Sequence, residues 1–404
     1  MAAPAELQVL HWWTSASERR AADLLAARLA AEGILWRDAA IPGGAGMGAG
    51  KVLRSRVLAG DAPEVTQMIG TSIAEWAGIG LLLELDDVAY AGQWAQVLFP
   101  TVRQLVQHRG HVVAAPLGIH RVNVLFGNRR VFDKLRLTPP RNWDEWVATA
   151  QALQAAGITP LALSSEPWQV ATMFEALVLA SGGPGLHRDL FVQHDPRATG
   201  DPRLLEALQR LRVLKAWTAA PVTEQPWTAA LQKLQRGEAA MMVMGDWAKG
   251  ELAAAGWSPG DQFFCQGVPG TAAFHLYSVD SFTLFAKDYT RSAAQERLAA
   301  VLMQPALQAD YNRVKGSVSP RLDADPAAMD ACARDSWTLF ARGEAVQAPS
   351  LVHRMATDEA SKDAIVAEVH RYFINDQVPA AEVQKRLGAM FRVLLNRPAR
   401  ASSR

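Results

Sequence analysis

Strand and helix patterns alternate along residues 7–79 of this chain. Residues 7–11 show the period-two alternation of a β-strand, and Ser15 with Glu18 three residues later matches the capping box that begins a helix. Further segments of the same two kinds follow at 34–39, 52–58, 64–69 and 71–79. Strands that alternate with helices favour a parallel sheet covered by helices, so we predict an α/β fold.

The length and composition indicate an ordinary globular protein with two domains or lobes. The chain has 404 residues and a net charge of +1, from 41 basic and 40 acidic side chains. Single cores rarely grow beyond about 250–300 residues, so we expect two. The balanced charge gives no electrostatic reason to bind nucleic acid or anionic lipid. No run reaches the ~18 apolar residues of a membrane span, and residues 1–6 lack the features of a signal peptide.

Two cysteines, Cys265 and Cys332, show neither CxxC nor metal-ligand spacing. In the cytosol we expect them to be free thiols. In an oxidising compartment we expect a disulfide that closes a long loop. Composition alone does not choose between these states, and no metal site follows from the sequence.

Catalytic and cofactor motifs are not found in the sequence, so we predict that the protein is not an enzyme and needs no cofactor. The glycine-rich segment 41–51 fails the P-loop pattern at Ala45 and at Val52, and we interpret it as a turn. His187 and His194 lie in a predicted loop and are expected to be solvated. A pair of carboxylates acting on a glycosidic bond stays an alternative.

Polar or aromatic residues recur at the ends of predicted strands. Trp12 and Trp13 follow the first strand, Gln67 lies near the end of the third, and Trp247 follows Asp246 after another. Asp280 lies inside the apolar segment LYSVDSFTLF, where a buried carboxylate needs hydrogen bonds. Open α/β sheets bind ligands beyond the carboxyl ends of their strands. Indole faces and carboxylates suit the CH face and the hydroxyl groups of a sugar.

Each of these residues also has a structural interpretation. Both indoles of the first pair could belong to the core, as could Trp247. Gln67 could satisfy backbone groups, and Asp246 could cap the helix that follows it. Asp280 is the residue that these alternatives explain least well.

Several longer motifs resemble a known family. They are HWWTSASE at 11–18, VLRSRVLAGDAPEVTQMIG at 52–70, IHRVNVLFGN at 119–128, NWDEW at 142–146, QPWTAAL at 225–231, GEAAMMVMGDWAKGE at 237–251, YSVDSF at 277–282 and KGSVSPR at 315–321. Together they resemble the periplasmic glucose-binding proteins of ABC importers, within family 1 of the extracellular solute-binding proteins. The likeness extends from about residue 7 to about residue 390.

The resemblance implies a two-lobed periplasmic-binding-protein fold, type II-like, with a hinge and a ligand cleft between the lobes. We expect an N-terminal lobe of residues 1–116 plus 279–322 and a C-terminal lobe of residues 117–278 plus 323–404. In this family the lobes close on the sugar, and the closed form docks on a permease. The resemblance also implies a periplasmic location, a monomer, and a disulfide between Cys265 and Cys332.

The resemblance also implies the residues that bind the sugar. Stacking is expected from Trp12 or Trp13, Trp227 and Trp247, and polar contacts from Glu18, Gln67, Asp280, Lys315 and His353. For Glu18, capping and sugar binding could both hold. His120, with Arg121 beside it, could order the hinge or touch the sugar.

Residue 69 departs from the family pattern. The glucose binders carry a polar or cationic side chain two places after the glutamine that corresponds to Gln67, and this chain has Ile69. A lost hydrogen bond to a sugar hydroxyl costs about 0.5–1.5 kcal/mol. Glucose stays the first expectation, with galactose, a deoxy sugar or a small oligosaccharide as alternatives. A sensor that signals to a receptor instead of a permease is a further alternative.

Overall fold

The structure is a computed structural model that describes residues 4–286 and 289–395. The chain divides into two compact units. Unit 1 contains Met1–Arg121, Asp246–Trp257 and Tyr277–Glu344, and unit 2 contains Val122–Gly245, Ser258–Leu276 and Ala345–Arg404. Within the described ranges, no helix combines the length and the apolarity that a membrane span requires.

Unit 1 is built on a mixed sheet in which the strands lie in the order β2-β1-β3-β11-β6. Their bounds are β1 Ala5–His11, β2 Ile34–Ala40, β3 Val65–Ile69, β6 Ala115–Arg121 and β11 His275–Leu284. The pairs β1–β2 and β1–β3 are parallel, as the alternation of strands and helices predicts. The long strand β11 runs antiparallel to β3 and to β6.

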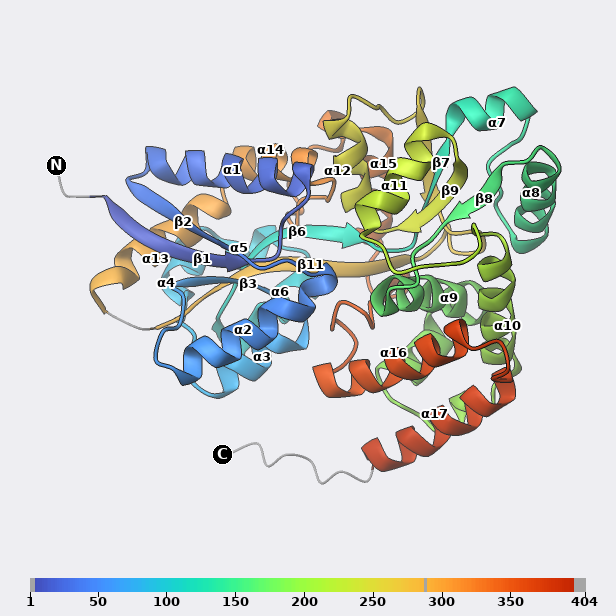
Figure 1. Cartoon of the computed structure of the whole chain (residues 1–404). Coiled ribbons are helices and arrows are strands. Elements are labelled where there is room, and N and C mark those ends of the chain that lie inside the picture. The colour runs from blue at the N-terminus through green and yellow to red at the C-terminus, as the bar shows by residue number, and fades with distance from the viewer. Residues whose placement is uncertain (1–3, 287–288, 396–404) are drawn as a thin grey trace. The chain divides into compact units, whose positions relative to one another are not determined.

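Helices cover both faces of this sheet (Figure 1). The views place α1 and α14 together on one face and α2 and α3 on the other. Helix bounds in unit 1 are α1 Ala16–Ala31, α2 Met47–Leu58, α3 Thr71–Gly78, α4 Asp86–Ala91, α5 Trp94–Val97, α6 Pro100–Leu105, α12 Trp247–Ala254, α13 Tyr289–Leu302, α14 Pro305–Lys315 and α15 Ala331–Phe340. The short strands β4 Gln107–His108 and β5 His111–Val112 form a separate ribbon. The predicted capping box is confirmed, since Ser15 and Glu18 each bond the backbone of the other.

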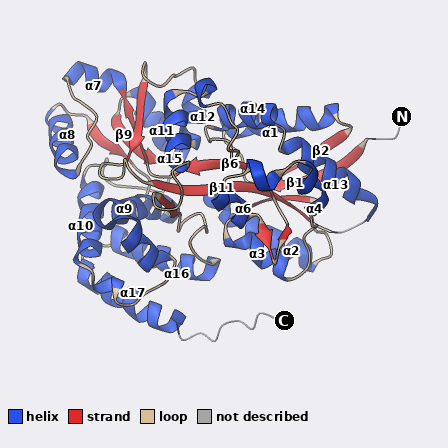
Figure 2. Cartoon of the chain, turned by 180° about the vertical axis from the view of Figure 1, so that it is seen from behind, coloured by secondary structure: helices blue, strands red, loops and turns tan. Residues whose placement is uncertain are grey.

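Unit 2 has a four-stranded sheet in the order β10-β7-β9-β8. Figure 2 draws strands in red and labels β9 of this sheet. The bounds are β7 Val124–Asn128, β8 Thr159–Ala162, β9 Ala239–Met244, β10 Phe263–Gly267 and β12 Gln347–Pro349, with helices α7 Arg129–Leu135, α8 Trp143–Ala155, α9 Pro167–Phe191, α10 Pro202–Ala216, α11 Trp227–Arg236, α16 Glu359–Ile374 and α17 Ala380–Leu395. The core is apolar and aromatic, with Trp146, Phe174 and Phe373 fully or almost fully buried. α9, α10, α16 and α17 lie together on one side of β8 and β9.

The α/β fold class is confirmed, but some local expectations are wrong. The sequence pattern over residues 292–314 predicts one helix, but the structure has two, because Pro305 begins α14 and has no N–H to continue a helix from α13. His187 is not solvated: it lies inside α9 with no exposed surface. His194 is half-buried and packs against Phe391. The turn expected in the glycine-rich segment is confirmed, since a 3-10 turn at 44–46 runs into α2.

The two units also differ from the expected lobes at residues 277–278 and in three longer segments, 117–121, 246–257 and 323–344, all of which belong to unit 1. The first segment pairs with β11 as part of β6. In the second, α12 packs against α1 and α14. In the third, Trp337 and Phe340 pack edge-on against Phe99. Strand pairing and helix packing therefore extend unit 1 beyond the boundaries that the sequence patterns indicated.

Candidate functional site

Unit 1 buries a histidine between two carboxylates. His120, on β6, lies with Nδ1 2.5 Å from Asp246 Oδ1 and with Nε2 3.3 Å from Asp280 Oδ2. All three residues are less than 7 % exposed. Burial alone would lower the pKa of His120, but the charge of Asp246, together with hydrogen bonds to both carboxylates, raises it. The pair of carboxylates therefore favours a protonated, positively charged imidazole at this point.

Asp280 is ionised although it is buried. Burial would raise the pKa of its carboxyl group, but the hydrogen bond and the charge of His120, the charge of Lys315 and a hydrogen bond from Gln67 lower that pKa to about 2. Gln67 Nε2 donates to Asp280 Oδ1 (3.1 Å). Because β3 and β11 are neighbours in the sheet, residues 213 positions apart meet here. A buried carboxylate that keeps its charge is a strong hydrogen-bond acceptor.

The two adjacent tryptophans have different environments. Trp13 has no exposed surface and packs against His11, Phe282 and Tyr311 at ring-centroid distances of 5.3, 5.6 and 5.9 Å. It is a core residue in this structure. Trp12 is half-buried and donates its backbone N–H to Gln67 Oε1 (3.2 Å).

Gly46 supports the indole of Trp12. A Cβ atom at this position would lie 3.1 Å from the indole ring, and the residue has a φ of 71°, which favours glycine. The glycine-rich segment, which the sequence presents as a turn, thus lies close against the indole of Trp12 at Gly46.

Glu18 combines two roles in unit 1. Its Oε2 accepts hydrogen bonds from the backbone N–H groups of Thr14 (3.1 Å) and Ser15 (3.2 Å). Its Oε1 accepts from Lys315 Nζ at 3.4 Å. Lys315 is almost fully buried, and its amino group lies 6.0 Å from the centre of the Trp13 ring. Glu18 therefore caps the helix and forms a buried ion pair with Lys315 at the same time.

Trp247 and Asp246 follow β9 at the start of α12. The indole of Trp247 meets the His120 ring edge-on, at a centroid distance of 5.4 Å and an angle of 73°. Asp246 does not cap α12 with its side chain, so that expectation is wrong. Its carboxylate instead bonds His120 and the backbone N–H of Arg121 (2.9 Å). Sequence reasoning missed this role, because the only signal was an acidic residue next to a tryptophan after an apolar strand.

Ile69 lies beside Asp280 in the sheet. The two residues are direct partners in the register of β3 and β11, and Ile69 is only 1 % exposed. The position that carries a polar side chain in the glucose binders is thus apolar and buried next to the charged cluster.

Unit 2 holds the other two predicted ligands. Trp227 is the first residue of α11 and is half-buried. His353 is buried in the segment that follows β12, with Nδ1 2.9 Å from Ser350 Oγ. The Ser350 hydroxyl also lies 2.7 Å from Glu175 Oε1 of α9. The sequence analysis did not single out Glu175.

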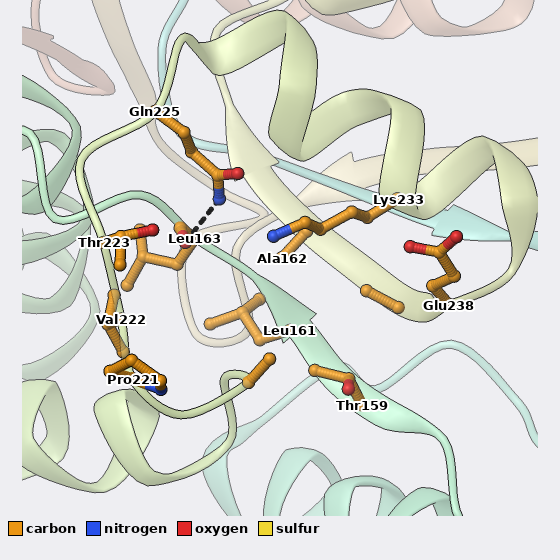
Figure 3. A pocket seen from close by; sticks show the side chains of 12 residues that line it. Thr159, Leu161, Ala162, Leu163, Pro221, Val222, Thr223, Gln225, Lys233 and Glu238 are labelled. Atoms are coloured by element: carbon orange, nitrogen blue, oxygen red, sulfur yellow. Dashed lines mark hydrogen bonds between the residues drawn. The ribbon is translucent and has the colours of Figure 1, made fainter.

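Two pockets lie within single units, and neither is lined by a predicted sugar ligand. In unit 1 a pocket of about 610 Å³ separates one side of α14 from residues 317–333 and includes the ion pair of Lys249 and Asp330. In unit 2 a pocket of about 160 Å³ lies between β8 and the segment before α11. Figure 3 shows Gln225 donating to the carbonyl of Leu163 (3.3 Å) there, while the Lys233 side chain reaches toward Ala162.

Metal-ligand geometry is limited to one exposed group. Over residues 4–286 and 289–395, the donor atoms of Glu84, Asp86 and His111 lie within 4.8 Å of one another. His111 Nδ1 is already 2.6 Å from Asp86 Oδ2, which accounts for their proximity without an ion. Cys265 and Cys332 are both disulfide-bonded.

The sequence profile of the bacterial extracellular solute-binding proteins matches residues 16–299. The chain belongs to this family. Relatives of this solute-binding protein that bear the name "Probable sugar-binding periplasmic protein" include the following two. One, from Brucella suis, is 37 % identical over 385 residues, which covers 95 % of this chain and 91 % of the relative. The other, from Rhizobium meliloti, is 36 % identical over 377 residues, which covers 91 % and 89 %.

Solved structures support the fold of this solute-binding protein. A chitin oligosaccharide binding protein superposes with a TM-score of 0.82 and 17 % identity, covering 96 % of this chain and 98 % of the other. At this identity the likeness shows the two-domain α/β fold alone.

Proposed function

We propose that this solute-binding protein is the periplasmic substrate-binding component of an ABC importer and that it captures a monosaccharide, with D-glucose as the first candidate. In this proposal the protein is a monomer that delivers the sugar to the permease subunits and performs no catalysis. The names of its relatives from Brucella suis and Rhizobium meliloti support a sugar as the solute and the periplasm as the location.

The observation that carries the proposal is the charged cluster of unit 1. Asp280 is held as an acceptor by His120 and Gln67, and the indole of Trp247 stands against His120. A carboxylate beside an aromatic ring accepts hydrogen bonds from sugar hydroxyls while the ring covers the CH face. Trp12, rather than the fully buried Trp13, is the stacking residue that we propose at the end of β1.

Five side chains complete the proposed ligand set. Glu18 and Lys315 offer one acceptor and one donor group in unit 1, and Gln67 links Trp12 to Asp280. In unit 2, Trp227 and His353 are proposed ligands of the same sugar.

Ile69 is the reason to test other sugars alongside glucose. Its buried, apolar side chain next to Asp280 supplies no hydrogen bond to a hydroxyl group. A sugar that lacks or inverts the corresponding hydroxyl would lose nothing at this position. Galactose, a deoxy sugar or a small oligosaccharide is therefore the alternative ligand class.

Titration of the intrinsic tryptophan fluorescence with D-glucose, galactose, mannose, xylose and maltose tests the proposal. We expect a saturable response to one monosaccharide. Asp280→Asn keeps the size of the side chain and removes its charge, and should weaken binding at least about 30-fold, as a charged hydrogen bond is worth about 1.5–3 kcal/mol and the buried neighbours lose their partner. Asp323→Asn, at an exposed carboxylate, is the matched control and should leave affinity unchanged. Silence toward all five sugars would reject the sugar as the solute.

A further inference from the structure

Three side chains of unit 2 form a hydrogen-bonded series that ends at His353. Glu175 Oε1 lies 2.7 Å from Ser350 Oγ, and Ser350 Oγ lies 2.9 Å from His353 Nδ1. Glu175 and Ser350 have no exposed surface, and His353 is 5 % exposed. Water therefore has little access to the two hydrogen bonds of this series.

The backbone holds the three side chains in place. Glu175 Oε2 accepts from the N–H of Leu351 (2.7 Å), and Ser350 Oγ accepts from the N–H of His353 (3.3 Å). The N–H of Met355 closes the turn on the carbonyl of Ser350 (2.9 Å). The Ser350 hydroxyl consequently stays between the carboxyl group and the imidazole.

A serine hydroxyl carries a single hydrogen, so it can donate to only one of its two neighbours. If Glu175 is ionised, the hydroxyl donates to the carboxylate and Nδ1 of a neutral His353 must carry the proton. If Glu175 is protonated on Oε1, the carboxyl group donates to Ser350 and the hydroxyl donates to Nδ1, which leaves the proton of His353 on Nε2. The state of the acid thus decides which ring nitrogen is the donor.

We infer that Glu175 acts through Ser350 as a positioning residue that sets the tautomer of His353, and hence whether its Nε2 offers a donor or an acceptor to a ligand. The consequence for the sugar rests on the proposed function, whereas the relay itself does not. When the relay ionises, one proton is released in total: the Glu175 proton passes to Ser350 Oγ, the Ser350 hydrogen passes to His353 Nδ1, and the ring releases its Nε2 proton to solvent.

The titration of Glu175 falls in an accessible pH range. Burial raises the pKa of Glu175 from 4.5 to about 8, although hydrogen bonds from Ser350, Leu351 and Val352 oppose the rise. No charged side chain contributes to this shift. The carboxyl group is therefore protonated at neutral pH and ionised in mildly alkaline solution.

Charged groups on the elements that pack against α9 form ion pairs with residues other than Glu175. The elements β9, β12 and the 3-10 turn at 198–200 contain none. On α10 and α16 the pairs are Arg203 with Asp201, Arg210 with Glu206, Arg212 and Lys215 with Asp376, Glu359 with Arg354, Lys362 with Asp363, and Glu368 with Arg371 and Arg386. His370 of α16 bonds the carbonyl of Ser165 through Nε2 (2.8 Å).

Long-range ¹H–¹⁵N spectra of the full chain with ¹⁵N-labelled histidine test the relay directly. His353 is assigned from its missing signals in His353→Gln. Between pH 6.5 and 9.5 we expect the protonated nitrogen of His353 to change from Nε2 to Nδ1, with a midpoint near the pKa of Glu175. His187, buried in the same helix and without a hydrogen-bond partner, is an internal control whose signals should not change. An identical tautomer of His353 at both pH values would overturn the inference.

Two variants separate the relay from a merely structural role. Glu175→Gln cannot titrate, and Ser350→Ala removes the connecting hydroxyl while leaving the carboxyl group. In both, His353 should show one tautomer throughout this pH range. A change that persists in either variant would show that another group controls His353.

Sugar affinity over the same pH range links the relay to binding. Because one neutral hydrogen bond is worth about 0.5–1.5 kcal/mol, we expect the affinity of the wild type for the sugar that it binds to change by roughly 3- to 10-fold, and that of Glu175→Gln by less than about twofold. If His353 changes tautomer but none of the five sugars binds at any pH, the relay stands and the proposed function fails. If a sugar binds with the same affinity at both pH values and His353 keeps one tautomer, the proposed function stands and the relay fails.

Discussion

The two units bury a carboxyl group in opposite ways. In unit 1, Asp280 lies beside the imidazole of His120, and its pKa is lowered to about 2. In unit 2, Glu175 lies beside a hydroxyl group and backbone N–H groups, and its pKa is raised to about 8. Burial would raise both pKa values. The difference arises because a positive charge adjoins one acid and only neutral donors adjoin the other.

Two buried acids therefore differ in protonation state because their neighbours differ. A cation beside Asp280 keeps a charged acceptor in a low-dielectric environment, as the proposed hydrogen bonds of this carboxylate to sugar hydroxyls require. Neutral donors around Glu175 let the acid hold its proton, so it can act as a relay instead. We therefore expect that replacing the cation in unit 1 changes the free energy of unfolding more than replacing any neutral donor in unit 2.

The largest effect is expected from His120→Ala. The substitution leaves Asp246 and Asp280 buried without the cation between them, and removing one partner of a buried ion pair costs about 3–5 kcal/mol. The pKa of His120 is raised in the folded state, so its stabilisation is fully present below its ordinary value of 6.5 and is lost as pH rises through the folded value. Urea unfolding of the wild type and the variant from pH 5.5 to 9 measures the loss of stability in the variant and the decline of the His120 contribution as pH rises.

His187→Ala is the matched control in unit 2. This histidine is equally buried but has no charged partner within hydrogen-bond distance, and burial lowers its pKa to about 3. Its presence therefore weakens the fold as pH falls from 6.5 toward 3, the opposite direction to His120. Equal pH profiles for the two variants would contradict the role of the carboxylates around His120.

Glu175→Gln should give the second-largest effect, a gain in stability over the wild type in alkaline solution. Since the pKa rises from 4.5 to about 8 on folding, the wild type loses stability as pH rises through that window, by up to about 4 kcal/mol. Glutamine has no such titration, so the difference in free energy of unfolding between variant and wild type should grow from pH 5 to pH 8.5. A constant difference over this range would show that Glu175 is already ionised in the folded protein at pH 5.

Local patterns in the sequence predicted the fold class and several elements of the candidate site. Period-two strands, the capping box of Ser15 with Glu18 and the apolar strand around Asp280 depend on nearby residues only, and the structure contains all three. The gathering of Gln67, His120 and Asp280 depends on the pairing of β11 with both β3 and β6. No local pattern specifies this antiparallel insertion into a parallel sheet.

Residues whose roles depend on a distant partner were the ones that sequence patterns missed. Asp246 has the sequence position of a helix cap, but His120 and the N–H of Arg121 take its carboxylate. Glu175 lies on an almost entirely buried helix, where an acid looks out of place until Ser350 and Leu351 are seen beside it. Trp12 and Trp13 are identical in type, and only the packing of Phe282 and Tyr311 makes one of them core.

A smaller effect is expected from Lys315→Met, which removes another buried cation of unit 1. Glu18 keeps its two backbone donors, Thr14 and Ser15, so it is not left without partners. We expect a loss of about 1–3 kcal/mol, less than for His120→Ala, from urea unfolding at pH 7. A loss as large as that of His120→Ala would indicate that Lys315 also stabilises Asp280, whose pKa it helps to lower.

The smallest effect is expected from Asp323→Asn, which tests whether burial matters at all to the charged pairs of unit 1. Asp323 bonds Arg321 at 2.7 Å, a shorter contact than that of His120 with Asp280, but half of its side chain is exposed. Water can replace the lost bond, so the change in free energy of unfolding should stay below about 1 kcal/mol. If this exposed pair proved as important as the pair at His120, distance rather than burial would decide how much a charge contributes. The contrast between Asp280 and Glu175 would then need another explanation.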